Sequence, residues 1–294
     1  MRLPISSSFC FKVKQLGPST IEGYRSAINS VWHASGRSLA GYHIDQLLKS
    51  FRAERPRSVI TFPKWDLALV MRVLSKPPFE PLASSSPKNL TRKTVFLLLM
   101  ATARRCGDIH AIDPSRVTFT RNAAILEPYP GYLPKVRNCA EGQERYQPIV
   151  VKSLSAITAD PEELVLCPVR ALKIYDEYAR KKNLSRNRFF ETLRSSGKVV
   201  CKNTVSSWVV SLIRDAYHDA TESDARLCSL STHEIRAISA SLAHQATFAL
   251  SDILATATWS NPNNFISHYL RNGEGLQGKL HMIAPGVVAS KTLR

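Results

Sequence analysis

The chain has 294 residues, and 40 Lys and Arg against 23 Asp and Glu leave a formal net charge of +17 at pH 7. Hydrophobic residues make up 44% of the chain, which is enough for one large domain or two modest ones. A disordered chain and a disulfide-stapled peptide are therefore excluded. The charge excess favours a polyanionic partner, of which nucleic acid is the first to consider, although a merely alkaline protein has the same composition.

The cysteines and the apolar segments indicate the compartment. None of the six cysteines lies in a CxxC pair or in a Cys/His cluster with zinc-site spacing. We therefore expect free thiols in a reducing compartment. The longest apolar run, 95–101, is too short to span a membrane, and residues 1–10 lack the apolar core of a secretory signal. The sequence predicts an intracellular protein with no membrane association.

Two helices and a connector are predicted in the N-terminal part of the chain. A helix fits 20–32, with Ser19 or Thr20 as its cap, and a second short helix fits 43–51. The apolar stripe of the first helix consists of Ile21, Tyr24, Ile28, Val31 and Trp32. The stretch 52–63 has two prolines and no helical period, which is typical of an exposed connector. We divide the chain into an N-terminal helical domain over 1–56, a connector over 57–63 and a larger domain over 64–294.

The larger domain is predicted to be mainly α with one small antiparallel β-sheet, an α+β fold class. Helices fit 64–74 and 90–105. Residues that favour strands cluster in 117–125 and 146–151, with a turn at Arg121–Asn122, and they indicate the sheet. Five further helices without an internal repeat are predicted over 168–182, 203–217, 232–247, 251–258 and 263–270.

Several familiar catalytic motifs do not occur in the sequence. There is no GxxxxGKS/T loop, no GxGxxG fingerprint, no GxSxG elbow and no HExxH pair. Binding of ATP or a dinucleotide and metalloprotease activity therefore have no support. What remains is a set of basic and hydroxyl-bearing residues.

The first candidate is the HxxR pattern of His233 and Arg236, in a helix for which Thr232 is the expected cap. A spacing of three residues places the imidazole and the guanidinium on one helix face. His268 and Arg271 repeat the pattern, so HxxR alone is weakly specific. The simplest alternative for either match is a surface pair on a basic helix.

Four further candidates are Arg105, Lys135, Trp259 and Tyr269. Each also has a purely structural interpretation. An arginine at a helix end interacts with the helix dipole, a lysine after a Pro/Gly turn is usually solvated, and an aromatic residue on a helix usually packs in the core.

Together the six residues resemble the catalytic set of the tyrosine recombinases, the phage-integrase family: an arginine, a lysine in a β-hairpin, HxxR, a histidine or tryptophan, and a tyrosine. The family's first box is similar to RCGDIHAI over 105–112, and THEIR over 232–236 matches the second box. Trp259, followed ten residues later by Tyr269, matches the third.

The resemblance extends to domain organisation and to a subfamily. It spans about 62–271, which places the Pro- and Ser-rich stretch 76–87 inside the catalytic domain. The helix around 19–35 resembles part of the family's DNA-clamping N-terminal domain. CPVRALKIY over 167–175 and WSNPNNFISHYLR over 259–271 resemble the recombinases of DIRS-type retroelements.

The resemblance implies how DNA phosphate would be held. Arg105 and Arg236 would bind the non-bridging oxygens through their planar, permanently charged guanidinium groups. His233 and the indole N–H of Trp259 would donate to the same developing charge.

The resemblance also implies the covalent step. Tyr269 would be the nucleophile that forms a 3′-phosphotyrosyl link, and Lys135 the general acid for the 5′-hydroxyl leaving group. Neither a metal nor ATP is implied, because the arginines hold the charge and the protein ester allows resealing. His268 lies outside the family pattern, and we expect it to be a packing or surface residue.

The implied function is a site-specific DNA recombinase or integrase of a mobile element. It would act on double-stranded DNA as a homo-oligomer, dimer to tetramer, and would be nuclear if a eukaryotic retroelement encodes it. Two alternatives stay open: a non-catalytic DNA-binding protein derived from such an enzyme, and a type IB topoisomerase, which shares the chemistry.

Overall fold

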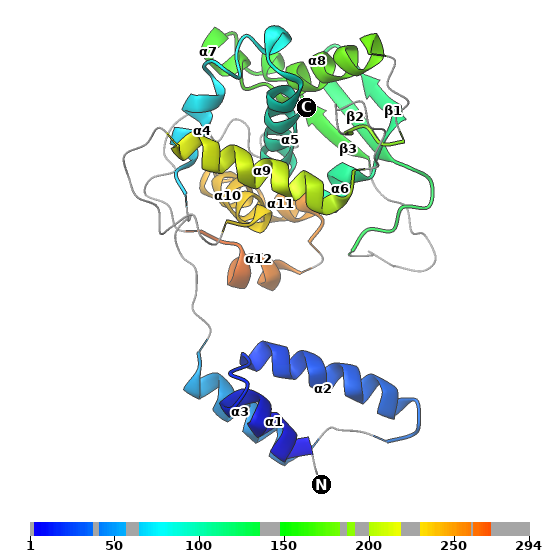
Figure 1. Ribbon diagram of the computed structural model, residues 1–294, viewed down its shortest axis with the longest axis vertical. Helices are drawn as coiled ribbons and strands as arrows, with labels where there is room; N and C mark the ends of the chain where they lie inside the picture. Colours follow the sequence, from blue (N-terminus) through cyan, green and yellow to red (C-terminus); the bar gives the residue numbers. More distant parts are fainter. Residues whose placement is uncertain are drawn as a thin grey trace. The chain divides into compact units, whose positions relative to one another are not determined.

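A computed structural model describes residues 3–37, 41–56, 65–135, 148–182, 187–191, 200–218, 230–259 and 261–271. The chain divides into two compact units, Met1–Val59 and Ile60–Arg294 (Figure 1). The connector predicted over 57–63 lies outside the described residues. In the part of the chain that the structure describes, no helix combines the length and apolarity needed to cross a membrane.

The first unit contains three helices in its described part: α1 (Leu3–Lys12), α2 (Pro18–His33) and α3 (Tyr42–Glu54). The sequence predicts α2 and α3 but not α1, whose short sequence LPISSSFCFK has little amphipathic character. The buried core consists of Phe11, Ile21, Leu48 and Phe51. The Phe11 and Phe51 rings stack with their centroids 4.1 Å apart, which joins α1 to α3.

Helix α2 confirms the predicted helix over 20–32 but not the burial of its apolar stripe. It begins at Pro18, with Gly17 as N-cap, because proline suits the first helical turn. Only Ile21 of the stripe is buried. The four exposed members are Tyr24, Ile28, Val31 and Trp32. Apolar periodicity therefore identifies the helix, whereas the small three-helix core has room for one of its side chains.

The second unit is built around helix α5 (Pro87–Thr102), which is buried from Leu90 to Thr102. Helices α8 (Pro168–Lys181), α9 (Lys202–Tyr217) and α10 (Thr232–Gln245) contact it (Figure 1). The apolar run 95–101 is thus the centre of a protein core. The predicted placement of 76–87 as a loop agrees with the structure, where it joins α4 (Leu67–Leu74) to α5 and contains the short 3-10 helix η1 (Leu82–Ser84).

Two helix boundaries differ from the prediction for identifiable reasons. Helix α4 begins at Leu67 rather than at residue 64, because the Asp66 carboxylate accepts the N–H groups of Ala68 and Leu69 and caps the helix. Helix α5 ends at Thr102 rather than at residue 105, because Ala103 adopts the left-handed conformation with φ of 48°. Arg105 thereby leaves α5.

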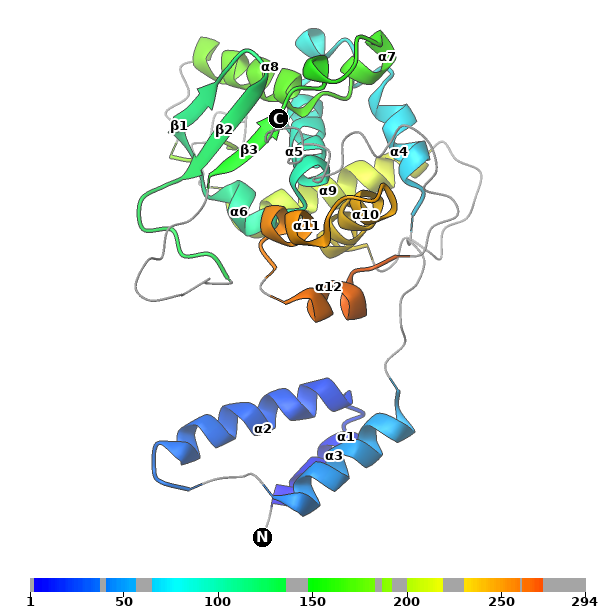
Figure 2. The same ribbon diagram turned by 180° about the vertical axis from the view of Figure 1, so that it is seen from behind.

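A three-stranded antiparallel sheet confirms the predicted fold class. Strands β1 (Ile112–Phe119), β2 (Ala123–Pro128) and β3 (Ile149–Lys152) lie in that order, and the chain turns at the predicted Arg121–Asn122. The register pairs Ala124 with Val151 and Leu126 with Ile149, and all four side chains are buried. The sheet contacts α5 and α8 (Figure 2). The predicted strand start at residue 146 lies outside the described residues.

Helices α8, α9 and α10, together with α11 (Leu250–Ala257) and α12 (Pro262–His268), follow the prediction with small shifts at their ends. Three short elements are not predicted: α6 (Cys106–His110), the 3-10 helix η2 (Leu154–Ala156) and α7 (Pro161–Leu164). Ser231, not Thr232, is the N-cap of α10, since its side chain accepts the backbone N–H of His233. Helix α12 ends at His268, which makes Tyr269 its C-cap residue rather than part of the predicted helix over 263–270. The four described cysteines, Cys10, Cys106, Cys167 and Cys201, are free thiols.

Candidate active site

Arg236 is a buried cation without a carboxylate partner among the described residues. It lies in the first turns of α10 and is 2% exposed. Its Nη2 donates to the carbonyl oxygen of Ala257 at 2.6 Å, whereas Nε and Nη1 have no hydrogen-bond partner within the described ranges. Buried donors that lack acceptors cost free energy, and a guanidinium with two of them is suited to bind an anionic oxygen.

Two aromatic side chains from other elements cover this guanidinium. The Cζ atom of Arg236 lies 4.2 Å from the ring centroid of Trp259 and 5.7 Å from that of Tyr269. The two rings are themselves in contact, with centroids 4.9 Å apart. Both distances from Arg236 are within the range of cation–π attraction, so the three side chains form one cluster.

The ends of two short helices bring Trp259 and Tyr269 to Arg236. Thr258 adopts the left-handed conformation and terminates α11, so that Trp259 turns back and donates its N–H to the carbonyl of Leu254. Asn261 then caps α12, and Pro262 occupies the first turn. Trp259 thus follows the end of α11 and Tyr269 the end of α12, and the two rings meet at Arg236.

The pKa of His233 is lowered by burial and by the other cationic candidates. Partial desolvation lowers the pKa of His233, and the charges of Arg236, Lys135 and Arg105 lower it further. The imidazole is therefore neutral at physiological pH. Three of the other predicted site residues, Arg236, Lys135 and Arg105, thus act on His233, and the four residues come from three segments of the chain.

Burial lowers the pKa of Arg236 to about 9, and the charge of Arg105 contributes next. At neutral pH the guanidinium still carries its proton and its charge. The charge of Arg105 acts on Arg236, so the two guanidinium groups repel each other. An anion between them would relieve their repulsion.

Arg105 is positioned by the short connection between α5 and α6. After Ala103 ends α5, Arg105 becomes the N-cap of α6, and its backbone N–H donates to Asp108 Oδ2 at 3.1 Å. Asp108 is 2% exposed. Its second oxygen, Oδ1, accepts the hydroxyl of Tyr132 at 2.8 Å, and Tyr132 belongs to the loop that leads to Lys135.

Lys135 is exposed and lies on the connection between β2 and β3, which are hydrogen-bonded neighbours. This position agrees with the hairpin lysine of the family pattern. Its charge affects His233, as described above, and residues 136–147 lie outside the described residues.

No family model and no curated protein matches the chain. Solved structures do match. The XerH site-specific recombinase bound to palindromic difH substrate, a post-cleavage complex, gives a TM-score of 0.56 at 11% identity, over 99% of this chain and 70% of that chain. The XerH pre-cleavage complex with difH gives 0.51 at 12% identity, over 89% of this chain and 65% of that chain. A lambda integrase dimer bound to a COC′ core site gives 0.52 at 13% identity, over 92% and 80%.

The chain has the fold of the tyrosine recombinases. This is the family that the sequence motifs resemble, and the mainly helical unit with its small sheet is the catalytic fold of that family. At 11–13% identity this similarity establishes the fold alone and does not establish which reaction the chain catalyses.

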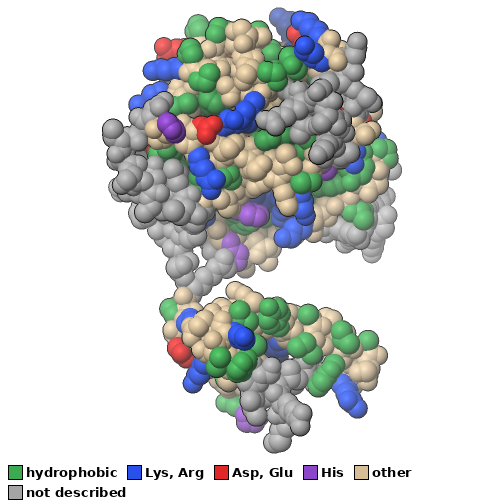
Figure 3. Space-filling view, in the orientation of Figure 1, with side chains coloured by type: hydrophobic (Ala, Val, Ile, Leu, Met, Phe, Trp, Pro, Cys, Tyr) green, Lys and Arg blue, Asp and Glu red, His purple; other side chains and the backbone are tan. Residues whose placement is uncertain are grey.

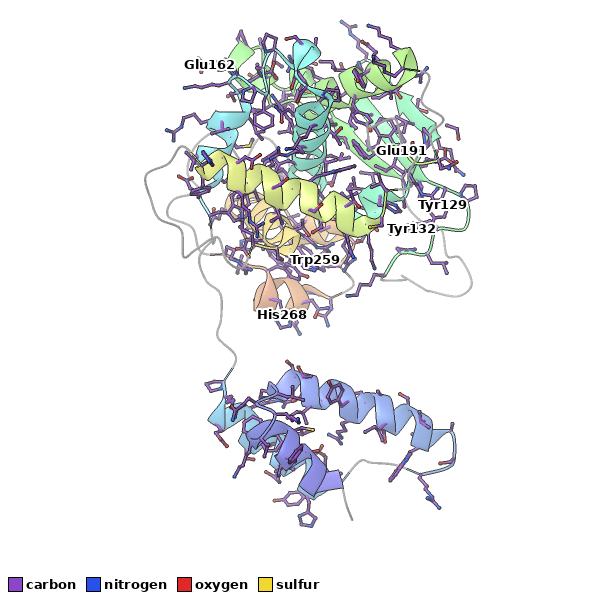
Figure 4. The ribbon with its side chains drawn as sticks, in the orientation of Figure 1. Tyr129, Tyr132, Glu162, Glu191, Trp259 and His268 are labelled. Carbon is purple, nitrogen blue, oxygen red and sulfur yellow. The ribbon has the colours of Figure 1, made fainter. Side chains whose placement is uncertain are left out.

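Within this tyrosine recombinase fold, the second HxxR match has a structural explanation. His268 is exposed at the end of α12, as Figure 4 shows, which agrees with its expected surface position. Arg271 is buried, and its Nε and Nη2 bind the two oxygens of Glu234 at 3.1 and 3.2 Å. The residues His268 and Arg271 thus do not form a second site.

Sequence reasoning missed two contacts that organise the candidate site. One is the hydrogen bond from Tyr132 to Asp108, and the other is the ion pair between Arg271 and Glu234. Asp108 and Glu234 both lie inside the motif boxes, within three residues of a candidate arginine, and this proximity was the available signal. Over the described ranges, no group of three His, Cys, Asp or Glu residues could hold a metal ion.

Proposed function

We propose that the protein is a site-specific DNA recombinase that cleaves and rejoins strands through a covalent 3′-phosphotyrosyl intermediate. The observation that carries this proposal is Arg236, a buried guanidinium with two unmet donors against the rings of Trp259 and Tyr269. The tyrosine recombinase fold supports it. In this proposal the second unit is the catalytic domain and the first unit a DNA clamp.

Arg105 and Arg236 hold the two non-bridging oxygens of the scissile phosphate. Their positive charges offset the negative charge on these oxygens in the transition state, which is the largest requirement of phosphoryl transfer. Neutral His233 and the Trp259 indole donate further hydrogen bonds to the same oxygens. In this mechanism the guanidinium groups do the work of metal ions, so neither a metal nor ATP takes part.

The hydroxyl oxygen of Tyr269 attacks phosphorus in line with the 5′ oxygen of the next nucleotide. A bond forms between phosphorus and the phenolic oxygen, and the bond from phosphorus to the 5′ oxygen breaks. Lys135 donates a proton to that leaving oxygen. Because the ester conserves the phosphodiester, a 5′-hydroxyl can attack it and reseal the strand.

Double-stranded DNA is the proposed partner. The net charge of +17 supports this, and Figure 3 shows Lys, Arg and His side chains on the face of the second unit between α9 and α12. We propose that two to four copies assemble on DNA and that a mobile element of DIRS type encodes the protein. The motifs CPVRALKIY and WSNPNNFISHYLR support the origin.

The decisive experiment traps the covalent intermediate. Wild-type protein is incubated with nicked suicide DNA substrates drawn from a random library, and adducts are separated on a denaturing gel. We expect a covalent shift with wild type, none with Tyr269→Phe, and an undiminished shift with the control Tyr178→Phe, whose ring lies in α8. Mass spectrometry of the adduct peptide identifies residue 269.

The other outcomes discriminate between the alternatives. An adduct of full yield in Tyr269→Phe contradicts the proposal. Salt-sensitive DNA binding without any adduct favours a non-catalytic DNA-binding protein. Relaxation of supercoiled plasmid by a monomer, without strand exchange between two sites, favours a type IB topoisomerase.

A further inference from the structure

A single buried carboxylate joins the first arginine box to the lysine loop. Asp108 Oδ2 accepts the backbone N–H of Arg105, and Asp108 Oδ1 accepts the hydroxyl of Tyr132. The Tyr132 oxygen also lies close to α6, because a Cβ added to Gly107 would meet it at 3.6 Å. The hydroxyl group of Tyr132 is therefore held at α6.

The beginning of the lysine loop is packed as well. Tyr129 donates its N–H to the carbonyl of Ala111, and its ring meets that of Tyr132 edge-on with centroids 5.7 Å apart. The guanidinium of Arg188 lies 3.8 Å above the Tyr129 ring. Figure 4 shows Tyr129 and Tyr132 on the loop beside α6. Side-chain packing and hydrogen bonds therefore anchor the loop as far as Tyr132.

Beyond Tyr132 this support ends. Leu133 and Lys135 are exposed, and within the described residues no hydrogen bond or ion pair holds the Lys135 side chain. The charge of Lys135 nevertheless lowers the pKa of His233, so the lysine lies close to the site. Tyr132 is the last side chain before Lys135 with an anchoring hydrogen bond in the described part of the loop.

We propose that Tyr132 is a positioning residue for Lys135: its hydrogen bond to Asp108 sets the loop so that the lysine reaches the 5′ leaving oxygen. This inference rests on the proposed function above. Tyr132 touches neither DNA phosphate nor the reacting atoms in this scheme, and its effect passes through the loop. Displacing a general acid by about 1 Å lowers the reaction rate on the order of 100-fold.

The test uses a change of leaving group. In a DNA substrate with sulfur in place of the scissile 5′ oxygen, the departing thiolate is a weak base and needs no proton from a general acid. Single-turnover cleavage is measured on the oxygen and sulfur substrates for wild type, Lys135→Ala, Tyr132→Phe and Tyr129→Phe. The last variant removes a neighbouring hydroxyl and keeps the ring, so it is the matched control.

We expect Tyr132→Phe to slow cleavage of the oxygen substrate by roughly 10- to 100-fold and of the sulfur substrate by less than about threefold. Lys135→Ala is expected to show the same pattern, and Tyr129→Phe to resemble wild type on both substrates. Because partial unfolding lowers both rates equally, the ratio of the two rates remains decisive even if Tyr132→Phe is less stable.

Equal slowing of Tyr132→Phe on both substrates overturns the inference, since it indicates a role in holding Arg105 or the fold. An unchanged rate on the oxygen substrate overturns it too. In both cases a sulfur rescue of Lys135→Ala leaves the proposed function intact. If wild type cleaves neither substrate, the proposed function itself fails and this inference falls with it.

Discussion

Arg236 is buried and has two unmet hydrogen-bond donors, Nε and Nη1, whereas the buried Arg92 has one, its Nε. Arg92 is as buried but is paired with Asp215, and Arg271 is paired with Glu234. A buried charge that the fold does not neutralise is retained at a cost to stability. Such a residue is the first place to look for an anionic ligand.

The substitution Arg236→Lys tests whether the site needs the planar set of guanidinium donors or only a positive charge. Arg236→Lys keeps a cation but loses the planar set of donors. We expect covalent adduct formation to fall by roughly 100- to 1,000-fold, while DNA affinity changes by less than about threefold. The exposed Arg214→Lys in α9 is the control. A wild-type rate in Arg236→Lys would contradict the proposed role of the guanidinium.

The pKa of His233 reports on whether Lys135 lies at the site in solution. Because the charge of Lys135 favours the neutral imidazole, Lys135→Ala is expected to raise the pKa of His233 toward its ordinary value. The measurement is an NMR titration of the imidazole carbon. Lys88→Ala, in the first turn of α5, is expected to leave the titration unchanged. If wild type and Lys135→Ala give the same titration curve for His233, Lys135 does not lie close to the site in solution.

The sequence predicts the identities of the six candidates but not their supports. Arg236, Trp259 and Tyr269 come into contact in the structure, and their roles stay predictions. The hydrogen bond from Tyr132 to Asp108 joins residues 24 positions apart, and the ion pair of Arg271 with Glu234 joins residues 37 apart. Local patterns carry no information about such pairings.

At the scale of elements, the segment after α12 is held on α10 by buried polar contacts. The Ser241 hydroxyl donates to the carbonyl of Tyr269 and accepts the N–H of Arg271, whose guanidinium binds Glu234. The helix that carries His233 and Arg236 thus also fixes the chain on both sides of the proposed nucleophile.

Loss of the Arg271 side chain is expected to destabilise the second unit strongly. Arg271→Ala leaves Glu234 buried without its partner, which costs about 3–5 kcal/mol. Arg116→Ala removes one partner of an ion pair with Glu127 in which both side chains are partly exposed, and we expect less than about 1 kcal/mol. Urea unfolding measures both free energies. Similar values for the two variants would show that the buried pair is not a structural anchor.

Helix ends show where elements are predictable from sequence. The apolar cores of α5, α8, α9 and α10 follow from periodicity, whereas their ends depend on single residues. Asp66 delays the start of α4 through two hydrogen bonds, and Ala103 ends α5 in a conformation that usually favours glycine. The end of α5 matters for function, because it decides that Arg105 belongs to α6 rather than to a continuous helix.

At the scale of the whole molecule, charge is expected to govern DNA affinity. A chain with a net charge of +17 releases many counterions when it neutralises phosphates. Between 50 and 200 mM salt we expect the affinity for duplex DNA to fall by roughly 1,000-fold. Fluorescence anisotropy with a labelled duplex measures the slope. An affinity independent of salt would exclude the proposed electrostatic binding.

The contact between Trp259 and Tyr269 gives the protein a built-in optical probe. The indole is nearly buried, lies against the phenol, and sits 4.2 Å from a guanidinium, so its emission depends on the state of that tyrosine. Subtracting the spectrum of Trp259→Phe removes the signal of the other three tryptophans. Stopped-flow fluorescence is then expected to follow the proposed formation and resealing of the ester in real time, without a gel or a labelled substrate.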